Sequence, residues 1–536
     1  MKLKSLFIYV LGMFLSAPIF VLAADAVSGS AVSAEADNAV LHFTVSRYVV
    51  EGASLLSKAE LDAAVAPYVG TNKDFSDVER ALEAVEAAYA KQGYTAVRVL
   101  LPEQELEKGT VHLRVVESHF GKVSVKDNHF VSEANALNAV PSVRASNVPR
   151  TNQMSRELRL ANENPARQMN VVLKAGERDD LVDADVIVTD SKPSIWGVGL
   201  DNSGSAETGY ARLYLSYQNA NAFKADHVAG IQLVTSPEYN FDRVKVIGAN
   251  YKMPFYRLNS SLEFFAGYSN VNSVVGGLSN FQGGGRLFST HYNYLLERMG
   301  MFYPTLTFGL DWRDYRQIVL TNPPPTVLYD EIVVVPVSVT YAAQGRTSDS
   351  NFNFNLSAVA NIPGANNGKA EDFATYDKVN MTDPNPHYKL FRYGADYSKS
   401  VGSDWLFRTA LYGQWSSDVL VQGEQIRLGG AYGIRGFTEG SEGGDKGARL
   451  NLEIYTPEFG SSDLKGRVLV FYDAGEATTI SNSLTTTIGS AGIGIRENYG
   501  DQFSLRCDVA QIENAGTDPA QYVGKWHAHL SINATF

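Results

Sequence analysis

The chain has 536 residues, enough for more than one folded domain, and it carries 46 basic and 58 acidic side chains. This balance provides no basic stripe of the kind that binds nucleic acid. Its single cysteine, Cys507, excludes an intramolecular disulfide, and its 46 glycines and 28 tyrosines suit strands that have one side in water.

The N-terminus has the pattern of a secretory signal peptide. Two lysines precede an apolar run over residues 6–15, and small residues follow. This order is typical of export signals, so we expect cleavage after Ala23 or Ala24. An uncleaved membrane anchor is the alternative, but Ser16 and Pro18 interrupt the run before it reaches the length of a span. An exported chain that enters a membrane without a spanning helix can cross it only as a closed barrel.

Two amphipathic helices are predicted within residues 41–118. Ser57 and Glu60 have the spacing of a capping box, in which each side chain accepts a hydrogen bond from the other residue's backbone, and they open the first helix. Ser76 and Glu79 repeat this spacing at the start of the second helix. Apolar residues then recur at helical intervals: Val78, Leu82, Val85 and Tyr89.

Strands flank these helices. Residues 43–45 precede them, and residues 97–101 and 111–116 follow, separated by a charged turn. The resulting order, β-α-α-β-β, recurs in weaker form over residues 119–191. In this second unit we expect strands near 123–125, 168–174 and 184–189 and helices near 133–140 and 152–162.

From residue 192 onward nearly every segment alternates between apolar and polar residues. Side chains on a strand point to opposite sides with a period of two, so such segments suit a wall between lipid and water. The last eleven residues show the pattern best, with Trp526, Ala528, Leu530, Ile532, Ala534 and Phe536 on one face. The region accommodates about sixteen strands of a transmembrane antiparallel β-barrel. Residues 362–386, rich in Gly, Asn, Asp and Pro, are expected to form a long extracellular loop.

One segment breaks the alternation, at Ile434-Arg435-Gly436-Phe437. Further along, Phe471 and Asp473 share a face, and the opposite face of that strand is apolar, so Asp473 should point into the lumen. If the loop folds back into the barrel, the Arg435 guanidinium can bind the Asp473 carboxylate through two parallel hydrogen bonds. Gly433 and Gly436 would permit the sharp reversal at the tip. The alternative is that Arg435 is one more solvated loop arginine.

These features resemble the two-partner secretion transporters of the haemolysin secretion/activation type, within the POTRA-barrel translocase superfamily. Residues Ile434 to Phe437 resemble its loop-six motif, and Phe471 with Asp473 resembles the partner motif on the barrel wall. The Leu-Gly-Gly before the loop motif and the Glu-Gly after it are closer to this branch than to the barrel-assembly branch. The two β-α-α-β-β units resemble POTRA domains.

The resemblance predicts a domain order. It comprises a signal peptide (1–24), a flexible segment (25–40), POTRA domain 1 (41–118), POTRA domain 2 (119–191) and a transmembrane β-barrel (192–536). Some transporters of this type begin with a plug helix and a Pro-rich linker. Residues 25–40 have neither a proline nor an amphipathic stripe, so the loop that carries Arg435 is expected to be the main obstruction of the lumen.

The resemblance also implies a function, in the bacterial outer membrane with the POTRA domains in the periplasm. The chain would recognise an unfolded, large β-helical exoprotein through those domains and export it through the barrel, as in type V secretion. Its other partners would be outer-membrane lipid and the barrel-assembly machinery, which would read Phe536 as an assembly signal. An assembly or insertase factor of the same superfamily is the alternative. A passive porin needs no periplasmic receptor.

No pattern in the sequence points to an enzyme. A G-x-S-x-G elbow is absent, and so are H-E-x-x-H and paired C-x-x-C motifs, so we expect no catalytic residue, no metal and no cofactor. His527 and His529 share a polar face of the last strand and need no metal to explain them.

Overall fold

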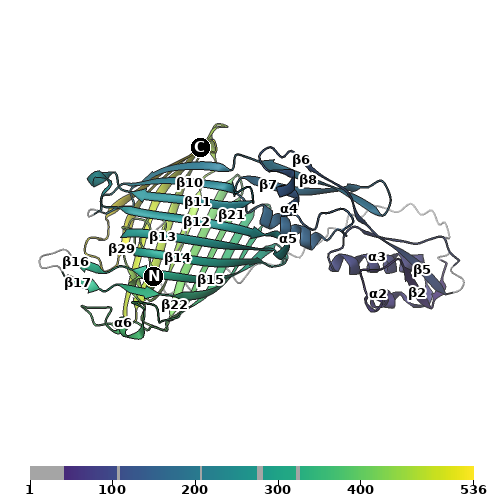
Figure 1. Ribbon diagram of the computed structural model, residues 1–536, viewed down its shortest axis with the longest axis horizontal. Helices are drawn as coiled ribbons and strands as arrows, with labels where there is room; N and C mark the ends of the chain where they lie inside the picture. The colour runs from purple at the N-terminus through teal and green to yellow at the C-terminus, as the bar shows by residue number, and fades with distance from the viewer. Residues whose placement is uncertain (1–40, 106–108, 206–207, 275–281, 321–325) are drawn as a thin grey trace, which may run out of the picture.

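The computed structural model describes residues 41–105, 109–205, 208–274, 282–320 and 326–536. The expected signal peptide and the segment 25–40 lie outside these residues. Within the described ranges, no helix is both long and apolar enough to cross a membrane. Two small α/β units extend from one end of a large β-barrel (Figure 1). We call this the near end of the barrel and the opposite end the far end.

The first α/β unit spans residues 43–117. Its elements are β1 (Phe43–Val45), β2 (Arg47–Glu51), α2 (Lys58–Val65), the single-turn helix η1 (Ala66–Tyr68), β3 (Gly70–Lys73), α3 (Phe75–Lys91), β4 (Val97–Leu100) and β5 (Thr110–Glu117). Strand β5 is central in the sheet β2-β5-β4, parallel to β2 and antiparallel to β4. The stripe of α3 lies in the core, where Val78, Val85 and Tyr89 are fully buried with Leu113.

Two details of this unit differ from the sequence prediction. The capping box of α2 is present at Ser57 and Glu60, but α3 is capped by Asp74, whose carboxylate accepts a hydrogen bond from the Asp77 backbone, and not by Ser76. The cap therefore lies two residues before the predicted one. The Ser76 hydroxyl donates to Asp74 Oδ1 over 2.6 Å. Two strands were not predicted as separate elements: β2, which follows the expected strand at residues 43–45 after a break at Ser46, and β3, which is short and polar and pairs with β1.

The second α/β unit spans residues 119–190 and has the predicted order β-α-α-β-β. It contains β6 (His119–Lys126), α4 (Glu133–Ala139), α5 (Thr151–Ala161), β7 (Arg167–Ala175) and β8 (Leu181–Asp190). Strand β8 lies between β6, to which it is parallel, and β7, to which it is antiparallel. The helices cover one face of this sheet around Ala136, Ala139, Val186 and Val188.

Sixteen antiparallel strands close the barrel within the described residues, because β18 continues into β19 and β25 into β26. They are β9 (Ser194–Asp201), β10 (Arg212–Ala222), β11 (His227–Thr235), β12 (Lys245–Phe255), β13 (Ser260–Val274), β14 (Gln282–Leu295), β15 (Phe302–Tyr315), β18 (Ile332–Val334), β19 (Pro336–Arg346), β20 (Ser350–Asn361), β21 (Lys389–Val401), β22 (Trp405–Ser416), β25 (Lys446–Tyr455), β26 (Phe459–Gly460), β27 (Leu464–Thr479), β28 (Leu484–Tyr499), β29 (Phe503–Ala515) and β30 (Trp526–Thr535). Strand β30 pairs with β9 and closes the ring. The predicted fold class is confirmed.

Smaller elements lie in the connections between strands. They are η3 (Glu238–Phe241), η4 (Tyr256–Leu258), β16 (Ile318–Leu320), β17 (Thr326–Tyr329), α6 (Ala370–Ala374), η5 (Gln422–Glu424), β23 (Ile426–Arg427) and β24 (Gly443–Gly444). The connection that holds α6, predicted from residues 362–386 as a long loop, lies at the far end with the β16–β17 hairpin (Figure 1). It is not bare loop, since Phe373 and Tyr376 pack into a buried apolar cluster.

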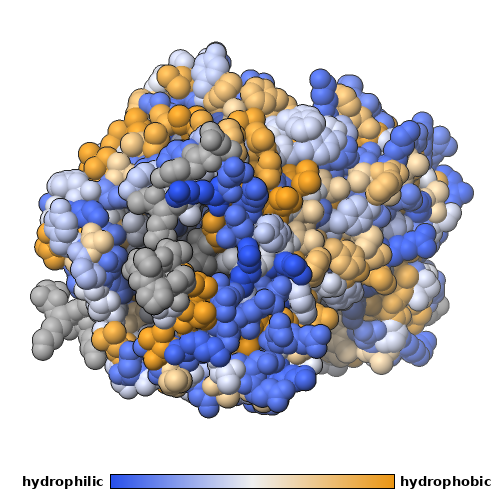
Figure 2. Space-filling model, turned by 60° about the vertical axis from the view of Figure 1, so that its left-hand side comes forward, coloured by the Kyte–Doolittle hydropathy of each residue, from blue (hydrophilic) through white to orange (hydrophobic). Residues whose placement is uncertain are grey.

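The outer face of the barrel is apolar. On β27, Val468 and Val470 are 39% and 51% exposed, whereas Leu469 and Phe471, one position along, are 1% and 5% exposed. Figure 2 looks obliquely at the far end, where hydrophobic residues gather along the upper flank and hydrophilic residues dominate the loops that face the viewer. Cys507 lies on β29 next to Asp508, which is buried inside, so its side chain points outward as expected.

The second α/β unit is fastened to the near end of the barrel by a buried ion pair. Arg167, at the start of β7, lies 2.7 Å from Asp226 Oδ2 in the β10–β11 turn. It also donates to the Tyr256 hydroxyl over 2.7 Å, and this hydroxyl donates to Asp226 over 2.9 Å. The Arg167 side chain has no exposed surface, and Asp226 is only 4% exposed. At the rim of the same contact, Lys252 and Glu163 form a more exposed pair at 3.0 Å.

We predict that Arg167→Ala loosens this attachment. Removing one partner leaves the Asp226 carboxylate buried and uncompensated, which costs about 3–5 kcal/mol. Spin labels on α5 and on the β14–β15 turn should therefore report a broader distance distribution in purified protein. The matched control is Lys252→Met, which breaks the half-buried pair at the rim and should change the distribution less, since pairs open to solvent contribute about 0–1 kcal/mol. Equal distributions for wild type and Arg167→Ala would rule out this role for the pair.

Candidate functional site

The connection between β22 and β25 folds back into the barrel. We call residues 417–445 the lumen loop. Strands β23 and β24 pair within it as a narrow hairpin, through Ile426 with Gly444 and Arg427 with Gly443. At its tip the chain turns back on itself, because Ile434 N–H donates to the Leu428 carbonyl over 2.8 Å.

Two glycines make this turn possible, as the sequence predicted. A Cβ atom on Gly433 would lie 2.2 Å from the Leu428 carbonyl oxygen, so no larger residue fits there. Gly436 has a φ of +92°, a conformation that L side chains rarely adopt. The Gly436 N–H donates to His529 Nε2 on β30 over 3.0 Å, which ties the tip to the wall.

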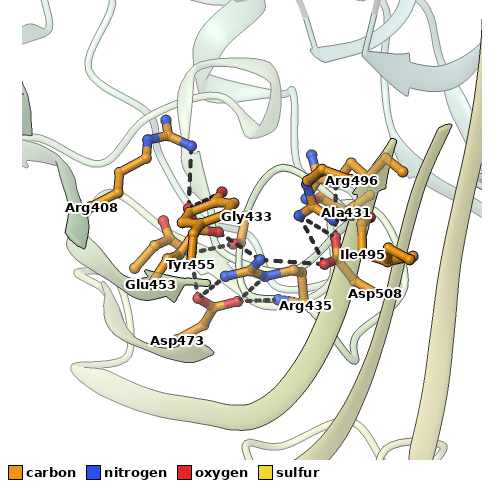
Figure 3. Close-up of polar contacts among 12 residues, drawn as sticks. Arg408, Ala431, Gly433, Arg435, Glu453, Tyr455, Asp473, Ile495, Arg496 and Asp508 are labelled. Carbon is orange, nitrogen blue, oxygen red and sulfur yellow. Dashed lines mark hydrogen bonds and ion pairs between the residues drawn. The ribbon is translucent and has the colours of Figure 1, made fainter. Parts of the chain in front are cut away.

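The structure brings Arg435 to Asp473 (Figure 3). Arg435 Nε donates to Asp473 Oδ2 and Nη2 donates to Oδ1, each over 2.7 Å, which is the two-pronged contact expected from the sequence. The Arg435 backbone N–H adds a third bond to the same carboxylate, at 3.1 Å. The side chains are 2% and 0% exposed. Arg435 is thus a fully engaged residue and not a solvated loop arginine.

Further groups that the sequence analysis missed surround the guanidinium. Arg435 Nη1 donates to Glu453 Oε1 on β25 over 2.7 Å and lies 3.7 Å from Asp508 Oδ1 on β29. The guanidinium carbon sits 3.5 Å from the centre of the Phe471 ring, a cation–π arrangement. Phe471, predicted as part of the wall motif, therefore packs its ring against the Arg435 guanidinium.

Three more arginines balance these carboxylates. Arg408 reaches Glu453 at 3.3 Å, and Arg496 and Arg506 each reach Asp508 at 2.8 Å. Alternating charges of this kind stabilise one another where water is scarce, and the loss of one member leaves its partner unpaired. Inward positions on β25 and β29 follow from the period of two, so the sequence could have flagged Glu453 and Asp508 as lumenal. It could not show which strands meet at Arg435.

The other predicted site residues have different surroundings. Ile434 and Phe437 are fully buried and pack in an apolar cluster with Ile488 and Ile512, so they anchor the tip against the wall. Phe536 lies far from the tip, at the near end of the seam between β30 and β9. There it exchanges backbone hydrogen bonds of 2.9 and 3.0 Å with Trp196.

The lumen loop does not fill the barrel. Beside it lies a cavity of about 540 Å³. The cavity is lined by β20, β21 and β22, by the loop tip at Tyr432 and by charged side chains that include Asp396, Arg408, Arg449 and Glu453. In the described part of the chain, no group of three or more His, Cys, Asp or Glu side chains is placed to hold a metal ion. His529 instead accepts the hydrogen bond from the loop tip.

Comparison with known proteins agrees with this architecture. The family model described as "Haemolysin secretion/activation protein ShlB/FhaC/HecB" matches residues 183–497, and the model "POTRA domain, ShlB-type" matches residues 43–118. The Heme/hemopexin transporter protein HuxB of Haemophilus influenzae is 23% identical over 496 residues, covering 88% of this chain and 82% of its own. The Outer membrane transporter CdiB of Escherichia coli is 25% identical over 423 residues, covering 77% and 68%.

Solved structures share the fold. CdiB from Escherichia coli superposes with a TM-score of 0.78 at 19% identity, covering 94% of this chain and 93% of its own. CdiB from Acinetobacter baumannii superposes with a TM-score of 0.71 at 14% identity, covering 100% and 97%. The family model spans more than half of the chain, and the fold and the relatives agree with it. The chain therefore belongs to the haemolysin secretion/activation protein family (ShlB/FhaC/HecB), the outer-membrane transporters of two-partner secretion.

Proposed function

We propose that this transporter takes an unfolded, large β-helical exoprotein from the periplasm, receives it on its α/β units and exports it through the barrel. We propose further that the contact between Arg435 and Asp473 is a clasp that holds the lumen loop in the resting barrel. The observation that carries this proposal is the two-pronged, buried bond between the loop tip and β27. An open pore would leak, whereas a loop fixed by a releasable ionic contact keeps the lumen narrow until the cargo arrives.

The proposed division of the chain follows from this function. Residues 1–24 are a signal peptide and 25–40 a flexible segment, 41–118 and 119–191 are POTRA domains, and 192–536 are the barrel. The far end then faces the outside of the cell. Outer-membrane lipid surrounds the apolar face, and the barrel-assembly machinery inserts the protein. The absence of catalytic motifs and the transporter relatives favour a non-enzymatic role without a cofactor.

The alternative of an assembly or insertase factor has less support. Such factors usually carry more POTRA repeats than the two α/β units in the described residues, and the relatives named above are transporters. A passive porin would have no use for the two α/β units or for a second unit fastened to the near end by buried charges.

Strand addition offers a physical route for cargo recognition. Strand β4 forms an edge of the first sheet, and an unfolded segment that adds to such an edge gains main-chain hydrogen bonds while side-chain pockets select its sequence. Leu100 on β4 is 44% exposed. The edge is short, and the Val99 N–H already donates to Glu86 Oε1 over 2.9 Å. The incoming chain would have to displace that carboxylate.

Deletion of residues 41–117 tests the receptor role. The first unit has its own core, separate from the barrel, so the truncated protein should still insert. Export of the partner should be abolished, because the receiving surface is gone. The measurement is the amount of exoprotein in the medium per unit of heat-modifiable barrel in outer-membrane fractions. Normal export by the truncated protein would contradict the proposal.

The clasp is tested by Arg435→Ala, Asp473→Ala and the double variant. Each single change leaves buried charges unpaired, at a cost of about 3–5 kcal/mol, so each should impair export. The double variant should be little worse than either, since residues that act as a unit are not additive. Arg435→Lys should fail in part, because an ammonium cannot make the two-pronged contact and also reach Glu453.

The measurement is again the amount of exported exoprotein per unit of inserted barrel. Single-channel conductance shows in addition whether the lumen loop has moved. Arg467→Ala is the matched control on the same strand, since its partner Asp404 lies in a turn and is 55% exposed, so the pair should matter less. If both alanine variants export normally, or if their defects simply add, Arg435 and Asp473 are not a functional pair.

The terminal strand is proposed to carry the assembly signal. Deleting Phe536 should reduce the amount of inserted barrel, because the assembly machinery would lose the aromatic end of the strand. Arginine at Leu530 or Ile532, which are 43% and 46% exposed on the outer face, should also reduce it, at a cost of about 2–4 kcal/mol each near the midplane. Asn533→Arg, on the inner face of the same strand, is the control. Unchanged heat-modifiable barrel in the Phe536 deletion would exclude the signal.

A further inference from the structure

The lumen loop has a second buried charge, eleven residues before Arg435. Glu424, at the end of η5, is completely buried. Its carboxylate accepts hydrogen bonds from Arg313 Nη1 over 2.8 Å, from the Tyr315 hydroxyl over 2.9 Å and from Arg392 Nη2 over 3.1 Å. A carboxylate stays charged in a buried position only with such partners, because without them its lost hydration is not compensated.

These partners lie on a different part of the wall from the clasp. Arg313 and Tyr315 belong to β15 and Arg392 to β21. In the strand order of the barrel, β15 and β21 lie on one side of the strands that the loop connects, β22 and β25, while β27 and β29 lie on the other. The loop is therefore fixed to two opposite sections of the wall, by Glu424 and by Arg435.

The surroundings of the two attachments differ. Near Glu424, the Gln414 side chain donates to the Glu424 carbonyl over 2.9 Å. The buried Asp445 carboxylate accepts from the Leu420 and Ile480 backbones over 2.8 and 2.7 Å, which joins the two ends of the loop. At the tip, the carboxylates that Arg435 contacts keep other partners if the arginine leaves: Asn451 Nδ2 donates to Asp473 over 2.8 Å, Arg408 contacts Glu453, and Arg496 and Arg506 contact Asp508. The tip is thus the easier end to release.

We propose that Glu424 is a positioning residue that anchors the stem of the lumen loop to β15 and β21, so that opening of the Arg435 clasp frees the tip but leaves the stem in place. This inference rests on the proposed clasp and deepens it. The stem, the part of the loop around Glu424, stays in place, and the tip, the part around Arg435, moves relative to the cavity beside it. A loop held in this way clears a passage without leaving the barrel and returns to the same position afterwards.

Conductance of the full-length protein in planar lipid bilayers tests the anchor without any cargo. Glu424→Gln alone should change little, because the clasp still holds the tip. Arg435→Ala should raise the occupancy of open levels, and the combined variant should raise it about tenfold further, as expected when coupled contacts are lost together. Glu442→Gln is the matched control, a carboxylate on the same loop that accepts backbone bonds from Thr517 and Asp518 instead. A combined variant that behaves like Arg435→Ala alone would overturn the anchor.

Trypsin added outside intact cells gives a second readout that a merely stabilising residue would not change. Arg427 lies in β23, between the stem and the tip. Cleavage after Arg427 should occur in the combined variant, whose loop leaves the lumen, and not in Arg435→Ala. Where Glu424→Gln lowers the amount of folded barrel, Arg392→Gln replaces it, since it removes one partner from the wall and should give the same cleavage. Protection of Arg427 in both combined variants would overturn the proposal.

Export and loop protection distinguish the Arg435–Asp473 clasp from the Glu424 anchor. If Arg435→Ala exports normally while the combined variants still open and are cut, the clasp has no role in export but the anchor stands. If Arg435→Ala blocks export while the combined variants match it in conductance and protection, the clasp stands and the anchor is wrong.

Discussion

A lipid bilayer offers no partner for a backbone N–H or C=O group, and this constraint shapes the whole chain. It requires the strands to close into a ring, which places every second side chain in a wet interior. The inner wall is largely polar, so the lumen loop is held by charged contacts as well as by the apolar cluster around Ile434 and Phe437. Its buried charges are stable because the wall supplies an opposite charge at each attachment, a carboxylate for Arg435 and arginines for Glu424.

The charged groups around the loop tip form a connected network. Arg435 faces Asp473, Glu453 and Asp508; further arginines contact Glu453 and Asp508, and the Asn451 amide donates to Asp473. Where water is excluded, such a network is strong when complete and costly when broken. This property is consistent with the proposed clasp.

The sequence predicted the parts that depend on local periodicity. Alternation with a period of two indicated the barrel and the inward direction of Asp473, and helical spacing indicated α2 and α3. The parts it missed depend on contacts between distant segments. The choice of Asp74 over Ser76 as a cap is one, because both residues can cap a helix and packing decides. Glu424 is another, since its wall partners Arg313 and Arg392 lie 111 and 32 residues before it in the chain, and only the arrangement of the strands brings them together.

The two joints outside the membrane have unequal stiffness. The second α/β unit is held to the barrel by the direct, buried contact of Arg167 with Asp226, while the first unit meets the second through surface contacts such as Thr151 N–H to the Gly93 carbonyl and the exposed pair of Arg98 and Asp179. A sideways pull therefore bends the outer joint first. The first unit is then expected to change its orientation more readily than the second, so that the proposed capture of cargo would not disturb the alignment of the second unit with the barrel.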